Sequence, residues 1–458
     1  MVTQSFYTVT AEYAAASTTL ILLSAEAYET KKDLSAHDER ILASVQFGAK
    51  IGEIALVFDT NGVLCKVYIG ADPERDDVAL AAVVMKLPVG TYHSATTLSN
   101  RALVMWALAQ YRYDAFRKVR AMPRVLAIHP DKSFAIAAEA DAIFLVRDLI
   151  NAPGNIMGPE EMANVVDTLA KTHHAHVQQW VGDELLGNNF PAIHAVGRAS
   201  ALAPRLLMLT WGDETHPRVS LVGKGVSFDS GGLDLKNAAG MRLMKKDMGG
   251  AAQVLGLAQW LMTMQLPIRL QVLIPAVENA VGPDAYRPGD ILTMRNGMTV
   301  EIDNTDAEGR LILADALAKA CEFTPELLID FATLTGAARI AVGTEISAMF
   351  CNDDALANEI VDWGTRVADP IWRMPLYQGY QALFESSIAD LANSSASPYA
   401  GAIIAALFLQ NFVQEGIPWM HFDIMAWNVS AKPGKPEGGE AMAILAVGHY
   451  LFKRYGHA

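Results

Sequence analysis

Two polar, glycine-rich segments interrupt a chain that is otherwise apolar, and both carry acidic side chains. The first spans residues 222–250 and the second spans residues 304–311. Glycine-rich turns let a backbone approach a ligand closely, so the two segments are candidates for one shared site. Together they supply four carboxylates: Asp229, Asp247, Asp306 and Glu308.

Four carboxylates cannot share a small site as free anions. Two unit charges about 4 Å apart repel by about 4 kcal/mol at an effective dielectric constant of roughly 20. Lys224, Lys236 and Arg310 supply part of the positive charge, and divalent cations would supply the rest. Carboxylate-rich ligation suits two ions held about 3.5–4 Å apart. The segments therefore predict a two-metal centre.

Simpler interpretations and other chemistries compete with a two-metal centre. Asp and Glu in glycine-rich turns are often only turn formers and helix caps. Any one of the four acidic residues, taken alone, is better explained as such a structural residue than as a catalytic one. Residues 223–225 lack the spacing of a phosphate-binding loop, and residues 225–229 lack the final glycine of a nucleophile elbow. His173, His174 and His176 form a cluster remote from the carboxylates, which is typical of a solvated polar stretch.

Alternating strands and helices are predicted after residue 150, with strands over 219–222, 269–277 and 327–331 and helices over 249–266 and 311–323. Such alternation is typical of a mostly parallel sheet covered on both faces. Ligands of such sheets bind at the carboxyl ends of the strands, where the polar segments fall. Residues 291–302 should fold back as a hairpin through Asn296-Gly297.

A smaller α/β domain is predicted before this one, so the fold class is α/β with a small N-terminal and a larger C-terminal catalytic domain. Strands are expected over 19–24, 51–58 and 63–69, the last two joined by a hairpin at Asn61-Gly62. A helix is expected over 98–113, and a long one over 133–150 capped by Ser133. The predicted division is an accessory domain at 1–132, a connecting helix at 133–150 and the catalytic domain at 151–458.

Composition excludes several classes of protein. The chain has 458 residues, 52% of them hydrophobic, which is too apolar for a disordered protein. Its net charge of −14 gives no electrostatic reason to bind nucleic acid or an anionic membrane. Three scattered cysteines and no targeting segment or long apolar run predict a cytoplasmic protein with no membrane association.

The octapeptide Asn304-Thr305-Asp306-Ala307-Glu308-Gly309-Arg310-Leu311 resembles the signature of the leucyl aminopeptidases, the cytosol aminopeptidase family of two-metal exopeptidases. Residues 222–232 and 236–250 resemble the other metal-binding segment of that family, with matching spacing. Residues 151–155 and 332–337 are similar to further blocks. The resemblance covers roughly residues 145–430, and an unbroken eight-residue signature is highly specific.

This resemblance implies ligand sets for two divalent cations, Mn²⁺ or Zn²⁺. Lys224, Asp229, Asp247 and Glu308 would hold one ion, and Asp229, Asp306 and Glu308 the other. A water or hydroxide bridging the metals would attack the peptide bond. Lys236 would stabilise the charge that develops on the carbonyl oxygen. A guanidinium stays protonated, so the resemblance implies a bicarbonate ion near Arg310 as general base.

The substrate implied is a peptide with a free N-terminus, whose first residue is leucine-like or otherwise neutral. Met244, Thr333 and Gly336 would surround the first side chain, and Leu334 would lie near the new amine. Met425 replaces the alanine common in the family, which puts a leucine preference in question. The family forms homohexamers, each a dimer of trimers. Two alternatives remain open: a non-catalytic regulator or scaffold, and a different two-metal hydrolase such as a phosphoesterase.

Overall fold

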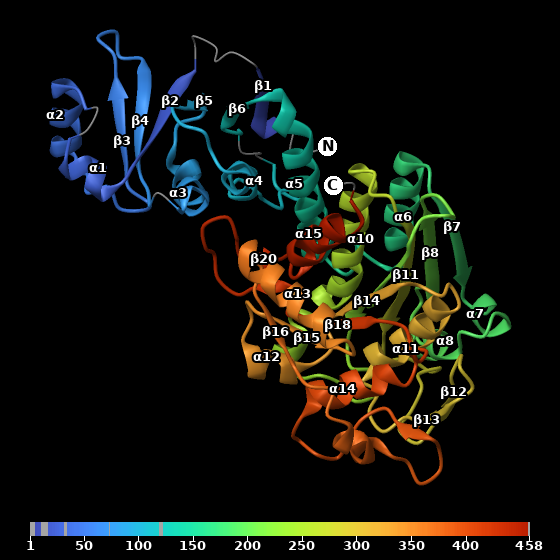
Figure 1. Cartoon of the computed structure of the whole chain (residues 1–458). Helices are drawn as coiled ribbons and strands as arrows, with labels where there is room; N and C mark the ends of the chain where they lie inside the picture. Colours follow the sequence, from blue (N-terminus) through green and yellow to red (C-terminus); the bar gives the residue numbers. More distant parts are fainter. Residues whose placement is uncertain (1–4, 11–16, 32–33, 73, 119–121, 457–458) are drawn as a thin grey trace. The chain divides into compact units, whose positions relative to one another are not determined.

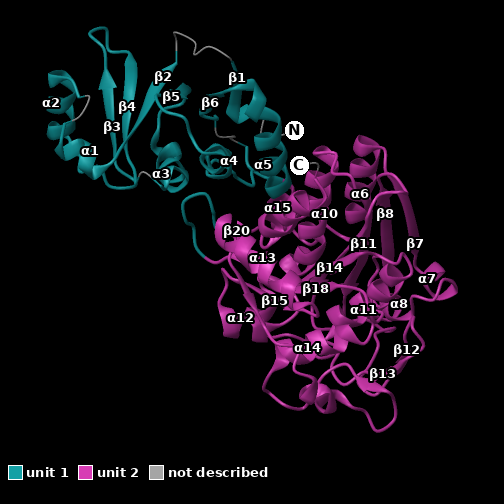
Figure 2. Cartoon of the chain, viewed as in Figure 1, with its two compact units in different colours: residues 1–144, 430–437 teal, residues 145–429, 438–458 magenta. Residues whose placement is uncertain are grey.

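The computed structural model describes residues 5–10, 17–31, 34–72, 74–118 and 122–456 (Figure 1). The chain divides into two compact units, residues 1–144 with 430–437 and residues 145–429 with 438–458 (Figure 2). The boundary falls inside the long helix α5 (Pro130–Asn151), within the segment that the sequence assigns to a connecting helix. Residues 430–437 return to the first unit, although no local pattern in the sequence sets them apart.

The first unit is built on a sheet whose strands are ordered β1-β6-β5-β2-β4-β3 within the described residues. All neighbouring pairs are parallel except β3 with β4, which form the predicted hairpin through Gly62. The elements are β1 (Tyr7–Val9), β2 (Thr18–Leu23), α1 (Ala25–Glu29), α2 (Ala36–Ser44), β3 (Ile54–Phe58), β4 (Leu64–Gly70), α3 (Asp76–Val83), η2 (Val84–Lys86), β5 (Thr91–Ser94), α4 (Asn100–Leu108) and β6 (Val125–Ile128).

The second unit begins with the C-terminal part of α5 and holds a larger mixed sheet. Its first elements are α6 (Pro159–His173), β7 (His176–Val181), α7 (Glu184–Gly187), α8 (Pro191–Gly197), β8 (Arg205–Trp211), β9 (Arg218–Gly223), β10 (Gly225–Asp229), α9 (Ala238–Met241), η3 (Met244–Met248), α10 (Gly249–Thr263) and β11 (Arg269–Asn279). Its later elements are β12 (Ile291–Thr293), β13 (Thr299–Glu301), α11 (Glu308–Cys321), β14 (Leu327–Ala332), α12 (Gly336–Val342), β15 (Ser347–Cys351), α13 (Asp354–Arg366), β16 (Ile371–Arg373), η4 (Gln378–Phe384), β17 (Leu391–Ala392), α14 (Gly401–Gln410), β18 (Trp419–Asp423), β19 (Trp427–Asn428), β20 (Gly438–Gly439) and α15 (Ile444–Tyr455).

The central strands of this sheet run parallel, in the order β18-β14-β9-β11. β8 and β15 flank them as antiparallel neighbours. Helices α10 and α11 both pack on β9, β11 and β14, and the sheet has helices on its two faces (Figure 1). The prediction of an α/β protein with a mostly parallel, doubly covered sheet is therefore confirmed. The strands are almost wholly buried and mostly apolar, as is typical of parallel strands covered on both faces.

Two local predictions can be compared with the structure. The segment 291–302 does fold back, with β12 and β13 paired antiparallel and Gly297 at a φ of +91°. The helix cap expected at Ser133 is wrong, because α5 begins at Pro130 and the Ser133 hydroxyl donates to the Pro130 carbonyl. Proline suits the first helical position because its φ is already helical. Within the described ranges, no helix has the length and apolar character that a membrane span requires.

Candidate active site

Lys224 lies between β9 and β10, at the carboxyl end of the central parallel strands. Its N–H donates to the carbonyl of Phe331 on β14, and its own carbonyl accepts from Ala251 on α10. The start of α10 can approach this closely because residue 250 is glycine. A Cβ there would lie 2.1 Å from the Phe331 carbonyl oxygen and 2.8 Å from the Lys224 nitrogen. Glycine at position 250 therefore lets the start of α10 pack closely against the backbone of Lys224 and Phe331.

Asp229 ends β10, and neighbouring groups hold its carboxylate in place. Its Oδ1 accepts from the N–H of Gly231 at 2.8 Å and from Nδ2 of Asn279 at 2.9 Å. The same Asn279 amide donates to the carbonyl of Thr305, which joins the first polar segment to the second. The Thr305 hydroxyl adds a hydrogen bond of 2.7 Å to the carbonyl of Gly231. These contacts fasten two loops that are distant in the sequence.

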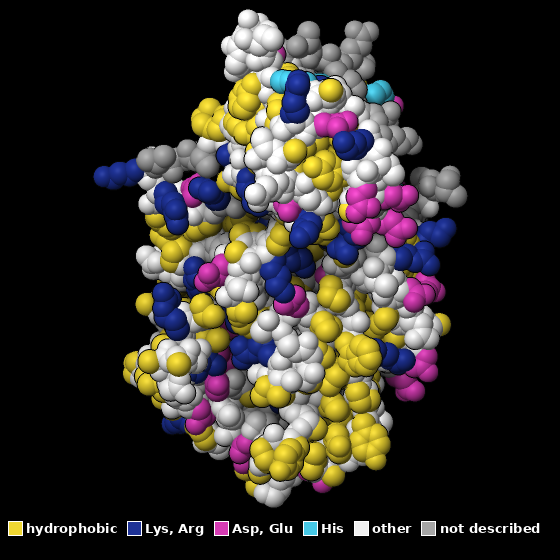
Figure 3. Space-filling model, turned by 90° about the vertical axis from the view of Figure 1, so that its left-hand side faces the viewer, with side chains coloured by type: hydrophobic (Ala, Val, Ile, Leu, Met, Phe, Trp, Pro, Cys, Tyr) yellow, Lys and Arg dark blue, Asp and Glu magenta, His cyan; other side chains and the backbone are white. Residues whose placement is uncertain are grey.

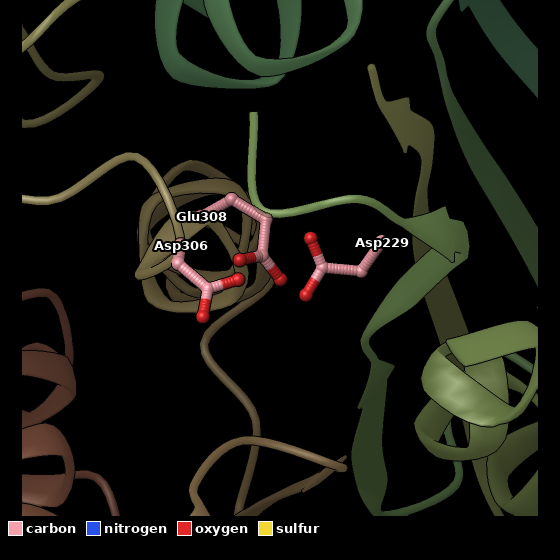
Figure 4. Close-up of side chains that lie close together, drawn as sticks. All are labelled: Asp229, Asp306 and Glu308. Atoms are coloured by element: carbon pink, nitrogen blue, oxygen red, sulfur yellow. The ribbon is translucent and has the colours of Figure 1, made fainter. Parts of the chain in front are cut away.

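The second loop delivers Asp306 and Glu308 to this point. The backbone N–H of Asp306 donates to the side-chain oxygen of Asn304 at 2.7 Å. Glu308 is the first residue of α11. One carboxylate oxygen each from Asp229, Asp306 and Glu308 lie within 4.8 Å of one another. Figure 4 shows the three carboxylates pointing toward a common centre. The sequence-based expectation that the two segments meet is realised in this cluster.

Two lysines occupy the spaces between the carboxylates. Nζ of Lys224 lies 2.7 Å from Oδ2 of Asp247 and 2.8 Å from Oε1 of Glu308. Nζ of Lys236 lies 2.8 Å from Oδ2 of Asp229 and also pairs with Oδ1 of Asp306. Each lysine thus bridges two acids, and together they reach every carboxylate that the sequence singled out.

Burial and crowding shape the charges of this cluster. Burial raises the pKa of Glu308 to about 8 and that of Asp306 to about 6, and the charge of Asp229 adds to both shifts. Burial opposes the charge on Lys224, but Asp247 and Glu308 outweigh it and raise the pKa of that amine. Because burial and neighbouring negative charge disfavour the ionised form of Glu308 and Asp306, additional positive charge at the site would stabilise their carboxylate anions.

The donor set fits divalent cations. Oδ2 of Asp247 and Oε1 of Glu308 are buried and accept no well-aligned hydrogen bond within the described part of the chain. Both contact Lys224 as ion pairs only. Carboxylate oxygens grouped within a few ångströms suit Mn²⁺ and related ions, and an amine adds an acceptable ligand for Zn²⁺ once it is deprotonated. The residues present therefore fit a metal ion held by acidic side chains.

A cavity of about 400 Å³ opens beside the carboxylates. Lys224, Thr333 and Ile424 reach it from positions just beyond the ends of β9, β14 and β18. Most residues predicted for the site line it: Lys224, Asp229, Lys236, Met244, Asp247, Asp306, Arg310, Thr333, Leu334 and Gly336. Met425 is not among the lining residues. It is buried, its sulfur accepts from Nη1 of Arg339 at 3.7 Å, and its neighbour Ile424 lines the cavity instead.

Several residues to which sequence reasoning gave no role lie in or beside the cavity. Lys246 and Arg339 line it as additional cations. Burial lowers the pKa of Lys246 to about 8, and the charge of Arg339 contributes to that lowering. Asp423 ends β18 and accepts from the N–H groups of Leu334 and Thr335 at 3.1 and 3.0 Å. Lys246 lies inside the segment 236–250 that resembles the family, and Arg339 follows the block 332–337 by two residues, and these positions were the only signal for them.

Two protein-family models match this chain. Residues 144–447 match the model of the cytosol aminopeptidase family, catalytic domain. Residues 22–128 match the model of the M17 aminopeptidase N-terminal domain. The first match covers most of the second compact unit, the second match lies within the first unit, and together they cover most of the chain.

Curated relatives and solved structures agree with these matches. A probable cytosol aminopeptidase of Nitratidesulfovibrio vulgaris is 39% identical over 394 residues, which is 81% of this chain and 78% of the relative. One of Xylella fastidiosa is 42% identical over 353 residues, 74% of this chain and 71% of the relative. The crystal structure of a cytosol aminopeptidase from Coxiella burnetii has a TM-score of 0.93 at 45% identity and covers 97% of this chain and 98% of its own. The bottromycin maturation enzyme BotP in complex with Mn has a TM-score of 0.87 at 32% identity, covering 96% and 100%.

Proposed function

This chain belongs to the cytosol aminopeptidase family, and we propose that it removes the N-terminal residue of peptides at the cavity beside Asp229, Asp306 and Glu308. The family and the metal-dependent exopeptidase activity predicted from the sequence are confirmed by the matches above. The observation that carries the assignment to this cavity is the convergence of three carboxylates within 4.8 Å. The phosphoesterase and scaffold alternatives lose support, because the whole acidic set is present in a member of a peptidase family.

Two divalent cations are proposed for this site. Lys224, Asp229, Asp247 and Glu308 would hold one, and Asp229, Asp306 and Glu308 the other, as the family resemblance implies. The contacts of Lys224 with Asp247 and Glu308 support the first set, because the lysine already bridges those two acids. Bound here, Mn²⁺ or Zn²⁺ would acidify water for attack and polarise the carbonyl of the scissile bond.

Lys236 is proposed to stabilise the oxyanion that develops on the scissile carbonyl. Its ammonium lies beside Asp229 and Asp306, and these acids raise its pKa despite the opposing effect of burial. The lysine therefore stays charged, as an electrostatic stabiliser should. A shortened side chain at this position would leave the metal ligands in place but remove the positive charge from the reacting carbonyl.

Arg310 is proposed to hold a bicarbonate ion that moves the proton. The guanidinium lines the cavity, and its Nε is buried with no hydrogen-bond partner within the described part of the chain. Such a donor is suited to an anion delivered from solvent. In bicarbonate-free buffer, Arg310→Ala should lose activity and recover part of it when bicarbonate is added. Full activity without rescue would remove this role from the proposal.

The substrate is proposed to enter with its free α-amine toward the metal site. Met244, Thr333 and Gly336 would surround the first side chain, and Leu334 would lie near the amine that leaves. Met425 remains a predicted determinant, through its packing behind the cavity wall rather than as a lining residue. A kinetic scan of aminoacyl amides with wild type and Met425→Ala checks this, since identical profiles would contradict it.

The decisive experiment is hydrolysis of leucine anilide after chelation, with stepwise return of Mn²⁺, Zn²⁺ or Mg²⁺. We expect activity to vanish with chelator and to return with Mn²⁺ or Zn²⁺. Asp306→Asn should not recover at any metal concentration used. Activity that survives complete chelation, or returns equally in Asp306→Asn, would contradict the proposal.

A homohexamer, arranged as a dimer of trimers, is proposed for the assembly. Large hydrophobic side chains stand exposed on the catalytic unit, among them Ile340 and Tyr399, which are 89% and 78% exposed. Figure 3 shows hydrophobic side chains gathered on the lower part of one face. Patches of this kind often mark protein contacts. Light scattering that reports a monomer would contradict the proposal.

A cytoplasmic location is proposed from the relatives' name. Nucleic-acid binding is not expected, and a gel-shift assay would check this.

A further inference from the structure

Two cations in the cavity have no part in the proposed metal ligation or in the attack on the peptide bond. Lys246 lines the cavity although the residue is only 3% exposed, and Arg339 of α12 lines the same cavity. The carboxylates of the metal cluster are paired with Lys224 and Lys236 instead. Within the described ranges, neither Lys246 nor Arg339 forms an ion pair with a carboxylate of the chain.

Arg339 lies next to Met425 and Gly336. Its Nη1 donates to Sδ of Met425 at 3.7 Å, and its Nη2 lies 3.3 Å from the place that a Cβ on Gly336 would occupy. Lys246 lies on η3, two residues beyond Met244. The cations therefore border Met244 and Gly336, which the proposed function makes walls of the pocket for the first side chain.

Asp423, at the end of β18, forms no ion pair with either cation within the described residues. Both oxygens of Asp423 are already occupied, Oδ1 by the N–H groups of Leu334 and Thr335 and Oδ2 by the Thr335 hydroxyl at 2.6 Å. A buried cation without a partner is costly, because removal from water is not offset by a counter-charge. An anion that enters the cavity from outside would supply that counter-charge.

We propose that this pocket binds an acidic side chain, so that the enzyme removes N-terminal glutamate or aspartate in preference to uncharged residues. The inference rests on the proposed function, since it takes Met244, Thr333 and Gly336 as walls of the pocket. Lys246 and Arg339 are the specificity-determining residues. A carboxylate suits them because guanidinium and ammonium groups form charge-assisted hydrogen bonds to its two oxygens.

Paired nitroanilides of glutamate and glutamine test the proposal with the Mn²⁺-loaded full chain. The two side chains have nearly the same shape and differ in charge, and an anilide has no C-terminal carboxylate. We expect kcat/KM for the glutamyl substrate to exceed that for the glutaminyl substrate by about tenfold or more, which is the size of one charge-assisted hydrogen bond. In Lys246→Met and in Arg339→Met, this ratio should fall by about fivefold or more toward unity.

Lys245→Met is the matched control. It removes the same charge from the same segment, but Nζ of Lys245 donates to the carbonyl of Asn151 at 2.6 Å, and the residue does not line the cavity. The glutamyl-to-glutaminyl ratio should stay at its wild-type value in this variant. Because a ratio within one protein is compared, a general loss of activity does not imitate the expected result. If Lys246→Met fails to fold, the glutamyl-to-glutaminyl ratio of Arg339→Met tests the proposal, because Arg339 is only half-buried.

The possible outcomes separate this inference from the proposed function. Hydrolysis of leucine anilide without any preference for glutamate over glutamine would overturn the inference alone, as would an unchanged ratio in both variants. The wild type could instead prefer Leu-Gly over Leu-Gly amide and lose that preference in the two variants. This result would mean that the cations bind the C-terminal carboxylate of the peptide, and it would also overturn the inference. No hydrolysis of any aminoacyl anilide with any metal would overturn the proposed function and the inference together.

Discussion

Gly309 lies between two residues of the proposed site, Glu308 and Arg310, and its substitution by alanine should disable the site without removing any ligand. A Cβ at this position would lie 2.5 Å from Cε, 2.7 Å from Nζ and 2.8 Å from Cδ of Lys224. Ordinary carbon contacts are about 3.5–4.0 Å, so the lysine must withdraw by about 1 Å.

Lys224 has little freedom to withdraw harmlessly. The side chain is buried, and Nζ contacts Asp247, Glu308 and the Thr333 carbonyl at 2.7, 2.8 and 3.2 Å. A site of this kind must be held within about 0.5 Å, and a displacement of about 1 Å can cost about a hundredfold in rate. Alanine suits a helix better than glycine by up to about 1 kcal/mol, which offsets part of an overpacking cost of about 1–3 kcal/mol.

We therefore expect Gly309→Ala to remain folded, with at most about 2 kcal/mol lost in the free energy of unfolding. Its kcat/KM for leucine anilide should fall by about a hundredfold at saturating Mn²⁺. Urea unfolding and steady-state kinetics over a Mn²⁺ titration measure the two effects separately. Gly187→Ala is the control, because nothing lies within 4 Å of its added Cβ. A folded Gly309→Ala with wild-type kcat/KM and wild-type Mn²⁺ dependence would refute this reasoning.

Three further predictions concern the metal site, Asp423 and the buried pair of His421 with Asp330. Mn²⁺ at about a hundredfold excess over its Kd should add about 2.7 kcal/mol to the free energy of unfolding of the wild type and none to Asp306→Asn, as urea titrations with and without chelator would show. Asp423→Asn weakens three hydrogen bonds to residues 334–335, and KM for leucine anilide should rise about tenfold in initial-rate assays. Burial opposes the charge of His421, but Asp330, 2.6 Å away, outweighs it and raises its pKa above 6.5. The contribution of this pair to the free energy of unfolding is complete below pH of about 6.5 and is lost as pH rises through the raised pKa. Asp330→Asn should remove this pH dependence and lower the free energy of unfolding by about 3–5 kcal/mol at low pH, as urea unfolding over a pH series would measure.

The fold class was accessible from the sequence because its signals are local. Buried parallel strands such as 269–279 are mostly apolar, and hairpins such as that at Asn61-Gly62 carry their turn residues with them. Helix ends were less accessible, since Ser133 has the right chemistry for a cap while Pro130 has the right geometry for a start. Residues 430–437 belong to the first unit through contacts with distant residues, which no local window contains.

The acidic residues and their chemistry were determined by the sequence alone, because four carboxylates in glycine-rich segments require cations wherever they meet. Where they meet was decided only by tertiary structure. Asn279 and Thr305 join loops about seventy residues apart, through hydrogen bonds that have no signature in either loop. The cations Lys246 and Arg339 likewise became neighbours of one cavity only through folding. Residue types set which charges can exist, whereas the long-range packing of the sheet sets the distances between them, and electrostatic energy depends on both.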